Sequence, residues 1–167
     1  RGEPLEDTAR VLSRYCHGAV VRTFGQERLE GLARLSAIPV INALSDYEHP
    51  CQALADLETL RERWGALAGR DLAYVGDGNN VAHSLMLAAA MAGMHVRSAN
   101  PPGFEPIPQV VQRAGEIAAQ TGGSVRVLND PLAASEGADV LYTDVWASMG
   151  QEAEADERAL VFPAYQL

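Results

Sequence analysis

The stretch DLAYVGDGNNVAHSLMLAAAMA, residues 71–92, decides the fold. Its residues 72–75 form a short apolar run with the length and composition of a buried strand. Residues 76–80 then supply glycines and asparagines that favour a turn, and the apolar run from about Val81 to Ala92 predicts a helix. A strand, a Gly-rich loop and a helix in this order predict the first half of a βαβ unit.

Outward from this stretch, strands and helices alternate in both directions. Strands separated by helices predict a parallel sheet that helices cover on both faces. Downstream, the patterns predict strands at residues 94–99, 124–128 and 139–143, with helices at 108–121 and 131–136. Upstream, they predict helices at residues 7–12 and 26–35, strands at 19–21 and 38–44, and a long helix from Pro50 that ends near Gly65.

A break in character near residues 65–70 indicates a domain boundary. We therefore expect an α/β fold whose main part is a doubly wound, Rossmann-like parallel sheet at residues 70–167. Residues 1–48 would be the C-terminal part of a second α/β domain, and residues 49–69 would be the linking helix. In such sheets ligands bind beyond the carboxyl ends of the strands, which selects four loops: residues 22–25, 45–52, 76–80 and 144–150.

The composition is that of a globular protein, and it narrows the possible partners. With 13 basic and 22 acidic residues the formal net charge is -9, which argues against nucleic-acid or membrane partners. The longest apolar stretch, residues 85–94, is shorter than a membrane span. Two cysteines without a C-x-x-C pair fit a reducing, cytoplasmic location. No initiator Met precedes Arg1, which indicates a fragment, a processed form or an incomplete chain.

The tetrapeptide His49-Pro50-Cys51-Gln52 is the first candidate for chemistry. Pro50 fits the first turn of a helix, so His49 lies at the helix N-terminus, where N–H groups and the helix dipole favour anions and carbonyl oxygens. Gln52 lies one turn further, so both side chains could point at one ligand. The alternative is that His49 caps the helix and Gln52 is solvated. Arg22, at the end of an apolar strand, could bind phosphate or polarise a carbonyl, or could be an ordinary surface arginine.

The Gly-rich loop, residues 76–80, resembles half of a dinucleotide fingerprint. Val81 stands where the third glycine would be, and the next strand ends in residues 98–100 without an acidic side chain for a ribose. We therefore expect no nicotinamide cofactor. Asn79 and Asn80 suit hydrogen bonds to a small polar ligand such as a carboxylate. Alternatively they cap the helix, and we expect one of them to do so.

The loop of residues 144–150 follows the last predicted strand. Asp144 could hold a substrate ammonium, and Ser148 with the N–H groups after it could hold a carboxylate, so the loop would clamp an α-amino acid. Gly150 would let the loop hinge. The alternative is an ordinary polar loop. Residues 152–157 are expected to be a solvated acidic stretch, and no grouping of Cys and His predicts a metal site.

Four motifs, in this order and at these spacings, resemble the aspartate/ornithine carbamoyltransferase family over essentially the whole chain. The His-Pro-x-Gln element at residues 49–52 is shared by the wider family. The Ser-Met-Gly element at residues 148–150 is the sign of the ornithine branch. The other matching stretches are residues 7–12, 76–80 and 144–152.

The resemblance implies a reaction and a role for each matching residue. The δ-amine of L-ornithine would attack the carbamoyl carbon of carbamoyl phosphate, giving L-citrulline and phosphate without a cofactor or metal. The family also implies a homotrimer and a place in arginine metabolism. Arg22 and His49 would be catalytic and would bind carbamoyl phosphate together with Gln52. Four residues would bind ornithine, namely Asn80, Asp144, Ser148 and the backbone of Met149.

Two family segments are expected to flank this chain. A Ser-Thr-Arg-Thr phosphate-binding loop should precede Arg1, and a His-Cys-Leu-Pro element, whose Cys lies near the δ-amine, should follow Leu167. We therefore expect a central fragment whose ornithine-binding half is incomplete at its C-terminus. If these 167 residues are the entire molecule, we expect little or no turnover.

Two rival interpretations stay open. The first is a carbamoyltransferase for another amine, such as putrescine, an acylated ornithine or aspartate, and the loop of residues 144–150 argues against it. The second is a catalytically inactive, Rossmann-like binding module.

Overall fold

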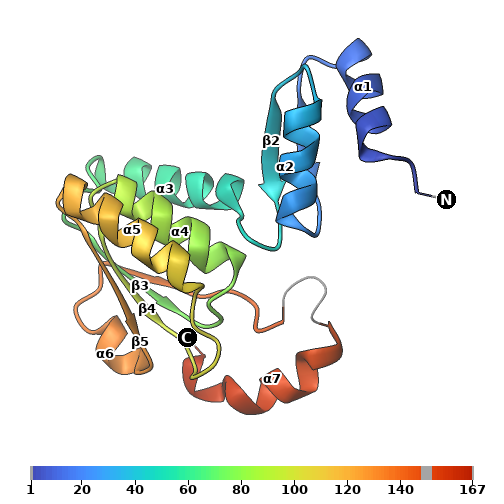
Figure 1. Ribbon diagram of the computed structural model, residues 1–167. Coiled ribbons are helices and arrows are strands. Elements are labelled where there is room, and N and C mark those ends of the chain that lie inside the picture. The colour runs from blue at the N-terminus through green and yellow to red at the C-terminus, as the bar shows by residue number, and fades with distance from the viewer. Residues whose placement is uncertain (1, 148–151, 167) are drawn as a thin grey trace.

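The computed structural model describes residues 2–147 and 152–166. Two parallel sheets organise these residues, and the long helix α3 (Pro50–Trp64) joins them (Figure 1). The N-terminal sheet pairs β1 (Ala19–Arg22) with β2 (Val40–Leu44). Helix α1 (Leu5–Tyr15) precedes this sheet, and α2 (Gln26–Leu35) connects its two strands.

The C-terminal sheet has the strand order β5-β4-β3-β6, and all its pairs are parallel. The chain runs outward from β3 (Asp71–Val75) to β4 (His95–Ala99) and β5 (Ser124–Leu128), then returns to β6 (Val140–Tyr142) on the other side of β3. Because the strand order reverses at β3, the loops that follow β3 and β6 flank a topological switch point, where such sheets bind ligands. The crossovers are α4 (Asn80–Met91), α5 (Pro108–Thr121) and α6 (Pro131–Ser135).

Helices cover both faces of the C-terminal sheet. Figure 1 shows α3, α4 and α5 side by side over one face and α6 on the opposite side. The chain then forms η1 (Glu152–Glu154), α7 (Ala155–Val161) and η2 (Pro163–Tyr165). The predicted α/β fold with parallel sheets is confirmed.

Two apolar clusters hold this sheet between its helices. The larger lies on the α4 and α5 side, where Leu72 and Val96 of the sheet pack with Leu85 and Met86, each at most 1% exposed. The smaller lies on the α6 side. There the fully buried ring of Phe162 packs with residues that include Val75, Ala99, Ala134 and Tyr165. Burial of both sheet faces explains why the central strand β3 is a continuous apolar run from Leu72 to Val75, whereas β4 and β5 carry polar residues between their apolar ones.

Local sequence features fix the turn that leads from β3 into α4. A Cβ atom at Gly78 would lie 2.2 Å from the backbone nitrogen of Pro106, so only glycine fits this close approach. The side chain of Asn79 then accepts hydrogen bonds from the backbone N–H groups of Val81 and Ala82 and caps α4. The prediction that one of the two asparagines caps the helix is confirmed, and the capping residue is Asn79.

The acidic stretch of residues 152–157 differs from its prediction in one respect. Its described side chains, residues 153–157, are exposed as expected, but the stretch is helical, in η1 and the start of α7. Asp156 and Glu157 stand in the first turn of α7, where the helix dipole favours negative charge. Phe162, just beyond the helix, anchors it to the core.

Candidate active site

A cavity of about 610 Å³ lies at the switch point, between the carboxyl ends of the two sheets. All four loops selected from the sequence contribute to its wall. The N-terminal sheet and the residues after it supply Arg22, Phe24, Leu44, Ser45, Asp46 and His49, and the rest of the chain supplies residues 77–81, His83, Ile107, Asp144, Val145 and Glu154.

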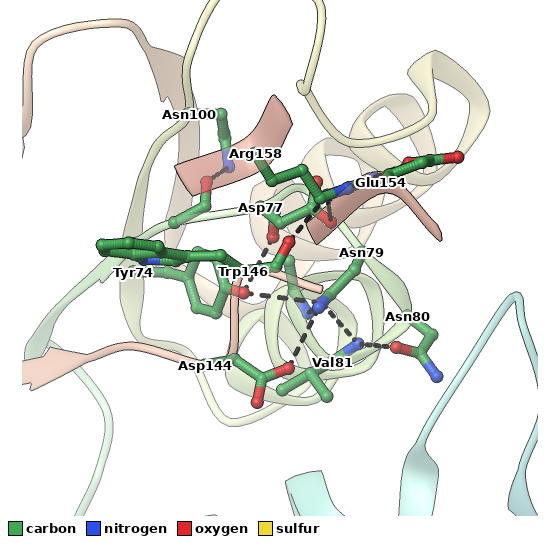
Figure 2. A network of polar contacts seen from close by, with 12 residues as sticks. Tyr74, Asp77, Asn79, Asn80, Val81, Asn100, Asp144, Trp146, Glu154 and Arg158 are labelled. Carbon is green, nitrogen blue, oxygen red and sulfur yellow. Dashed lines mark hydrogen bonds and ion pairs between the residues drawn. The ribbon is translucent and has the colours of Figure 1, made fainter. Parts of the chain in front are cut away.

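Asp144 and Asn79 join the two loops at the switch point. Asp144 follows β6, Asn79 follows β3, and the Asn79 amide donates a 3.0 Å hydrogen bond to the Asp144 carboxylate (Figure 2). The hydroxyl of Tyr74, at the centre of the sheet, donates to the carbonyl oxygen of Asp77 in the same loop at 2.8 Å. These contacts place one carboxylate of the cavity on a framework tied to the buried sheet.

Arg22 and His49 come from the N-terminal side of the cavity. Arg22 ends β1, opposite Leu44, at the point where the register of the β1–β2 pair shifts. His49 occupies the N-cap position of α3, as the alternative interpretation expected, but its side chain makes no capping hydrogen bond. Its Nδ1 atom is buried and has no hydrogen-bond partner among the described residues. A buried ring nitrogen of this kind can bind a ligand that enters the cavity.

Charges from both walls act on His49. Burial lowers the pKa of its imidazole, the Arg22 guanidinium lowers it further, and the Asp144 and Asp56 carboxylates oppose this shift. A lowered pKa keeps the imidazole uncharged at neutral pH. The cavity therefore offers a fixed cation, a neutral imidazole and a carboxylate around one space.

Gln52 does not line this cavity. It lies one turn into α3, as predicted, but its amide donates to Asp56 Oδ1 at 2.8 Å. Asp56 in turn accepts a 2.9 Å hydrogen bond from the hydroxyl of Tyr142 on β6. Gln52 is therefore part of a polar contact between α3 and the C-terminal sheet, and its predicted contact with a ligand stays a prediction.

Asn80 lines the cavity, but both ends of its side chain already have partners. Its Nδ2 donates to the carbonyl oxygen of Ser45 at 2.6 Å, and its Oδ1 accepts from the backbone N–H of Val81 at 3.0 Å. The side chain is buried, at 8% exposure. Asn80 therefore connects the two parts of the chain, and a ligand would meet an amide that is already hydrogen-bonded.

A buried ion pair supports the loops that carry the cavity. Arg158 of α7 donates to Asp77 Oδ2 at 2.7 Å and to the carbonyl oxygen of Trp146 at 2.9 Å, and it pairs with Glu154 (Figure 2). The Arg158 and Asp77 side chains are 6% and 8% exposed. Burial raises the pKa of the Asp77 carboxyl, and the Arg158 charge opposes that rise. One guanidinium thus links α7 to the loops after β3 and β6.

Two family models match the chain. The carbamoyl-P binding domain of aspartate/ornithine carbamoyltransferase matches residues 1–62, and the Asp/Orn binding domain matches residues 68–167. The chain belongs to the aspartate/ornithine carbamoyltransferase family.

Relatives within this carbamoyltransferase family are similar over the full chain but are longer. The ornithine carbamoyltransferase of Parafrankia sp. strain EAN1pec is 64% identical over 167 residues, which are 100% of this chain and 53% of that protein. The solved structure of the Pyrococcus furiosus ornithine carbamoyltransferase superimposes with a TM-score of 0.95 at 53% identity, covering 100% of this chain and 53% of the other. For the Gloeobacter violaceus enzyme the TM-score is 0.91 at 54% identity, over 99% and 55% of the two chains. The chain therefore spans about half the length of these relatives.

Seven site residues were predicted, and the structure of this carbamoyltransferase chain brings four of them to one cavity. Ser148 and Met149 lie outside the described residues. Gln52 lies behind the wall in the contact between α3 and the sheet. The four residues at the cavity are Arg22, His49, Asn80 and Asp144.

Several residues of the cavity and its supports were missed. The hydroxyl of Ser45 accepts hydrogen bonds from the backbone N–H groups of Tyr47 and Glu48, and Asp46 accepts one from the N–H of Gly25. Ser45 and Asp46 stand in a loop that the sequence had selected, so their position was available as a signal. Arg158 gave no such signal, because its partner Asp77 is 81 residues away in the chain.

Neither a membrane span nor a metal cluster is found in the part of the chain that the structure describes. No helix in residues 2–147 and 152–166 is long and apolar enough to cross a membrane. Within the same residues, no group of three or more His, Cys, Asp or Glu side chains could hold a metal ion.

Proposed function

We propose that the intact protein is an ornithine carbamoyltransferase. This chain would contribute most of the ornithine-binding half and the adjoining part of the carbamoyl-phosphate-binding half. The observation that carries the proposal is the single cavity with Arg22 and His49 on one wall and Asp144 on the other. We assign residues 1–48 to carbamoyl-phosphate binding, residues 49–69 to the link and residues 70–167 to ornithine binding, with the family matches meeting between residues 62 and 68.

The N-terminal wall suits a carbamoyl group attached to phosphate. Arg22 presents a cation that can pair with phosphate or with the carbonyl oxygen. His49, kept neutral by burial and by Arg22, can hydrogen-bond that oxygen without adding a second charge. Both groups would stabilise the negative charge that grows on the oxygen in the tetrahedral transition state. We assign Gln52 as a further ligand that would have to leave Asp56 to reach the substrate.

The C-terminal wall suits the charged end of an amino acid. Asp144, held by Asn79, would bind the α-ammonium of ornithine. We assign Asn80, Ser148 and the backbone of Met149 to the same substrate. Held in this way, ornithine would extend its δ-amine toward the carbamoyl carbon, and this orientation supplies much of the rate.

The reaction is a balanced acyl transfer. The uncharged δ-amine forms a C–N bond to the carbamoyl carbon, the C–O bond to phosphate breaks, and the proton that the amine nitrogen loses ends on the departing phosphate. The products are citrulline and phosphate. Because the ammonium form of the amine cannot attack, the rate should fall at low pH.

We also propose a cytoplasmic homotrimer that acts in arginine metabolism. Cys16 and Cys51 are free thiols, which fits a reducing compartment. Large apolar side chains such as Val20 and Leu54 are 69% and 65% exposed, which leaves apolar surface available for assembly. Light scattering coupled to size exclusion of the intact protein would test the trimer.

Initial rates with carbamoyl phosphate and a panel of amines test the proposed activity. The intact protein should form citrulline from ornithine faster than it carbamoylates putrescine, an acylated ornithine or aspartate at equal concentrations. A higher rate with putrescine would contradict the substrate assignment. Calorimetry with NAD separates the binding-module alternative, because NAD binding without a response to ornithine would favour it.

A further inference from the structure

Helix α4 buries polar side chains on one face of its first two turns. The helix is otherwise apolar, yet Asn80, His83 and Ser84 are 8%, 2% and 4% exposed. These three positions are spaced i, i+3 and i+4, so they lie on one side of the helix. Buried polar groups need hydrogen-bond partners, and all three find them in the loop that leads from β2 to α3.

The contacts with this loop, residues 45–49, are short and follow one another along the chain. Asn80 donates to the Ser45 carbonyl at 2.6 Å, and His83 Nδ1 lies 2.7 Å from the Tyr47 carbonyl oxygen. The backbone N–H of His49 then donates to Ser84 Oγ at 2.7 Å. Helix α4 therefore holds this loop by hydrogen bonds along its whole length, up to His49, whose imidazole lines the cavity.

The partners of His83 determine where its proton sits. The backbone N–H of Ile107 is 3.1 Å from Nε2, and an N–H can only donate, so Nε2 must be the acceptor. The proton is therefore on Nδ1, where it is donated to the Tyr47 carbonyl. Burial lowers the pKa of His83, which keeps the ring in this neutral form. His83 thus connects the loop between β4 and α5 to the loop between β2 and α3.

The His49 N–H has no partner within its own helix. His49 is the residue at the N-terminal cap of α3, and N–H groups at a helix start have no carbonyl four residues back. Ser84 supplies the missing acceptor from a different element. This bond fixes the backbone to which the His49 side chain is attached.

We propose that Ser84 and His83 are positioning residues for His49, and that together they set its imidazole at the right place for carbamoyl transfer. The inference rests on the proposed function and deepens it. Neither side chain has to touch a substrate. Their effect passes through the backbone of residues 47–49, so it should change the chemical step more than the binding of ornithine.

Kinetics of Ser84→Ala in the intact protein test this role. The substitution removes the acceptor of the His49 N–H, and a displacement of about 1 Å at a reacting group can cost roughly 100-fold in rate. We expect kcat to fall by about 10- to 100-fold, while KM for ornithine stays within about twofold. Ser84→Thr keeps a hydroxyl and should recover most of the rate. Ser135→Ala is the matched control, because the Ser135 hydroxyl bonds the Pro131 carbonyl within α6.

A pair of His83 substitutions separates the two bonds of that ring. In His83→Asn the amide nitrogen can take the place of Nδ1 and keep the bond to the Tyr47 carbonyl. In His83→Gln the amide of the longer side chain lies where Nε2 was, and the Tyr47 carbonyl is left without its partner. His83→Asn should therefore retain more of kcat than His83→Gln, even where the two are equally stable.

Hydrogen exchange in the unsubstituted protein supplies a reading that needs no variant. Helix-cap N–H groups normally exchange quickly, whereas the His49 amide should be strongly protected by Ser84. Rapid exchange of this amide would overturn the proposal, as would Ser84→Ala with unchanged kcat, whether or not stability falls. Loss of ornithine binding with unchanged kcat would overturn it too. Failure of the proposed function is a separate result, because the unsubstituted protein would then form no citrulline.

Discussion

The two sheets of this chain have the same parallel pairing but are stabilised differently. In the C-terminal sheet, Leu72 and Val75 of β3 are 0% exposed, because helices cover both faces. In the N-terminal sheet, Val20 and Ile41 are neighbours across the two strands and are 69% and 51% exposed. The C-terminal sheet therefore has a complete core of its own, whereas nothing in residues 2–147 and 152–166 covers one face of the N-terminal sheet.

The ion pairs of the two regions show the same contrast. The Asp77–Arg158 pair is almost fully buried at the base of the cavity. On α1, the pair of Arg10 with Glu6 has side chains that are 69% and 53% exposed. Exposed pairs contribute little to stability, whereas breaking a buried one leaves an unpaired charge in the interior. The C-terminal wall of the cavity is therefore fixed by its own core, and the N-terminal wall depends on its hydrogen bonds to α4.

The largest expected effect comes from breaking the buried pair. Arg158→Met should lower the free energy of unfolding by about 3–5 kcal/mol, because it leaves the Asp77 carboxylate buried and unpaired. Urea denaturation of the intact protein measures this. Arg113→Met is the control, since Arg113 pairs with Glu116 on the exposed surface of α5, and it should change stability by less than about 1 kcal/mol. A change below about 1 kcal/mol for Arg158→Met would show that the Asp77–Arg158 pair does not stabilise the loops that follow β3 and β6.

A pair of truncations compares the two sheets directly. Leu85 is 1% exposed in the larger cluster. Leu85→Ala should therefore lower the free energy of unfolding by about 2–5 kcal/mol, because the truncation leaves a cavity. Ile41→Ala removes a similar side chain from the exposed face of β2 and should cost less than about 1 kcal/mol. Equal losses in the two variants would mean that the open face of the N-terminal sheet is covered in the intact protein, for example by a partner subunit.

A smaller effect should appear on acidification. Burial lowers the pKa of His83 below its usual value of 6.5, so the unfolded chain binds a proton before the folded one does. Stability from this group is complete above pH 6.5 and is lost as pH falls from 6.5 through the lower folded pKa. Unfolding of the protein and of His83→Asn, compared between pH 7.5 and 5.5, should show a steeper loss in the unsubstituted protein. Parallel curves would contradict the assignment of a neutral, buried ring.

Much of the fold was predictable because its signals are local. The strand, Gly-rich loop and helix at residues 71–92 are set by apolar runs and turn residues, and the structure has them within one residue of the prediction. The helix of α7 was missed because its acidic residues carry no apolar period and its anchor, Phe162, follows the helix. Its stability comes from contacts with distant residues, which a local pattern does not contain.

The candidate site shows the same difference between local signals, which a sequence pattern contains, and contacts between distant residues, which it does not. The placement of Arg22, His49 and Asp144 at the cavity was predictable, because each lies at or beyond the carboxyl end of a parallel strand, where such sheets bind ligands. The hydrogen-bond partner of each polar side chain was not predictable, since these partners lie far away in the chain. The Asn80 amide bonds the Ser45 carbonyl 35 residues away, and no pattern around residue 80 indicates that partner.

The division of labour between the two walls of the cavity is the central claim, and the Michaelis constants of Asp144→Ala and Arg22→Ala test it most directly. A charged hydrogen bond contributes about 1.5–3 kcal/mol, or roughly 10- to 100-fold in affinity. Asp144→Ala should raise KM for ornithine by that factor and leave KM for carbamoyl phosphate within about threefold, and Arg22→Ala should do the reverse. Asp156→Ala, on the exposed start of α7, is the control and should change neither. Equal changes for both substrates in both variants, or no change at all, would contradict the account.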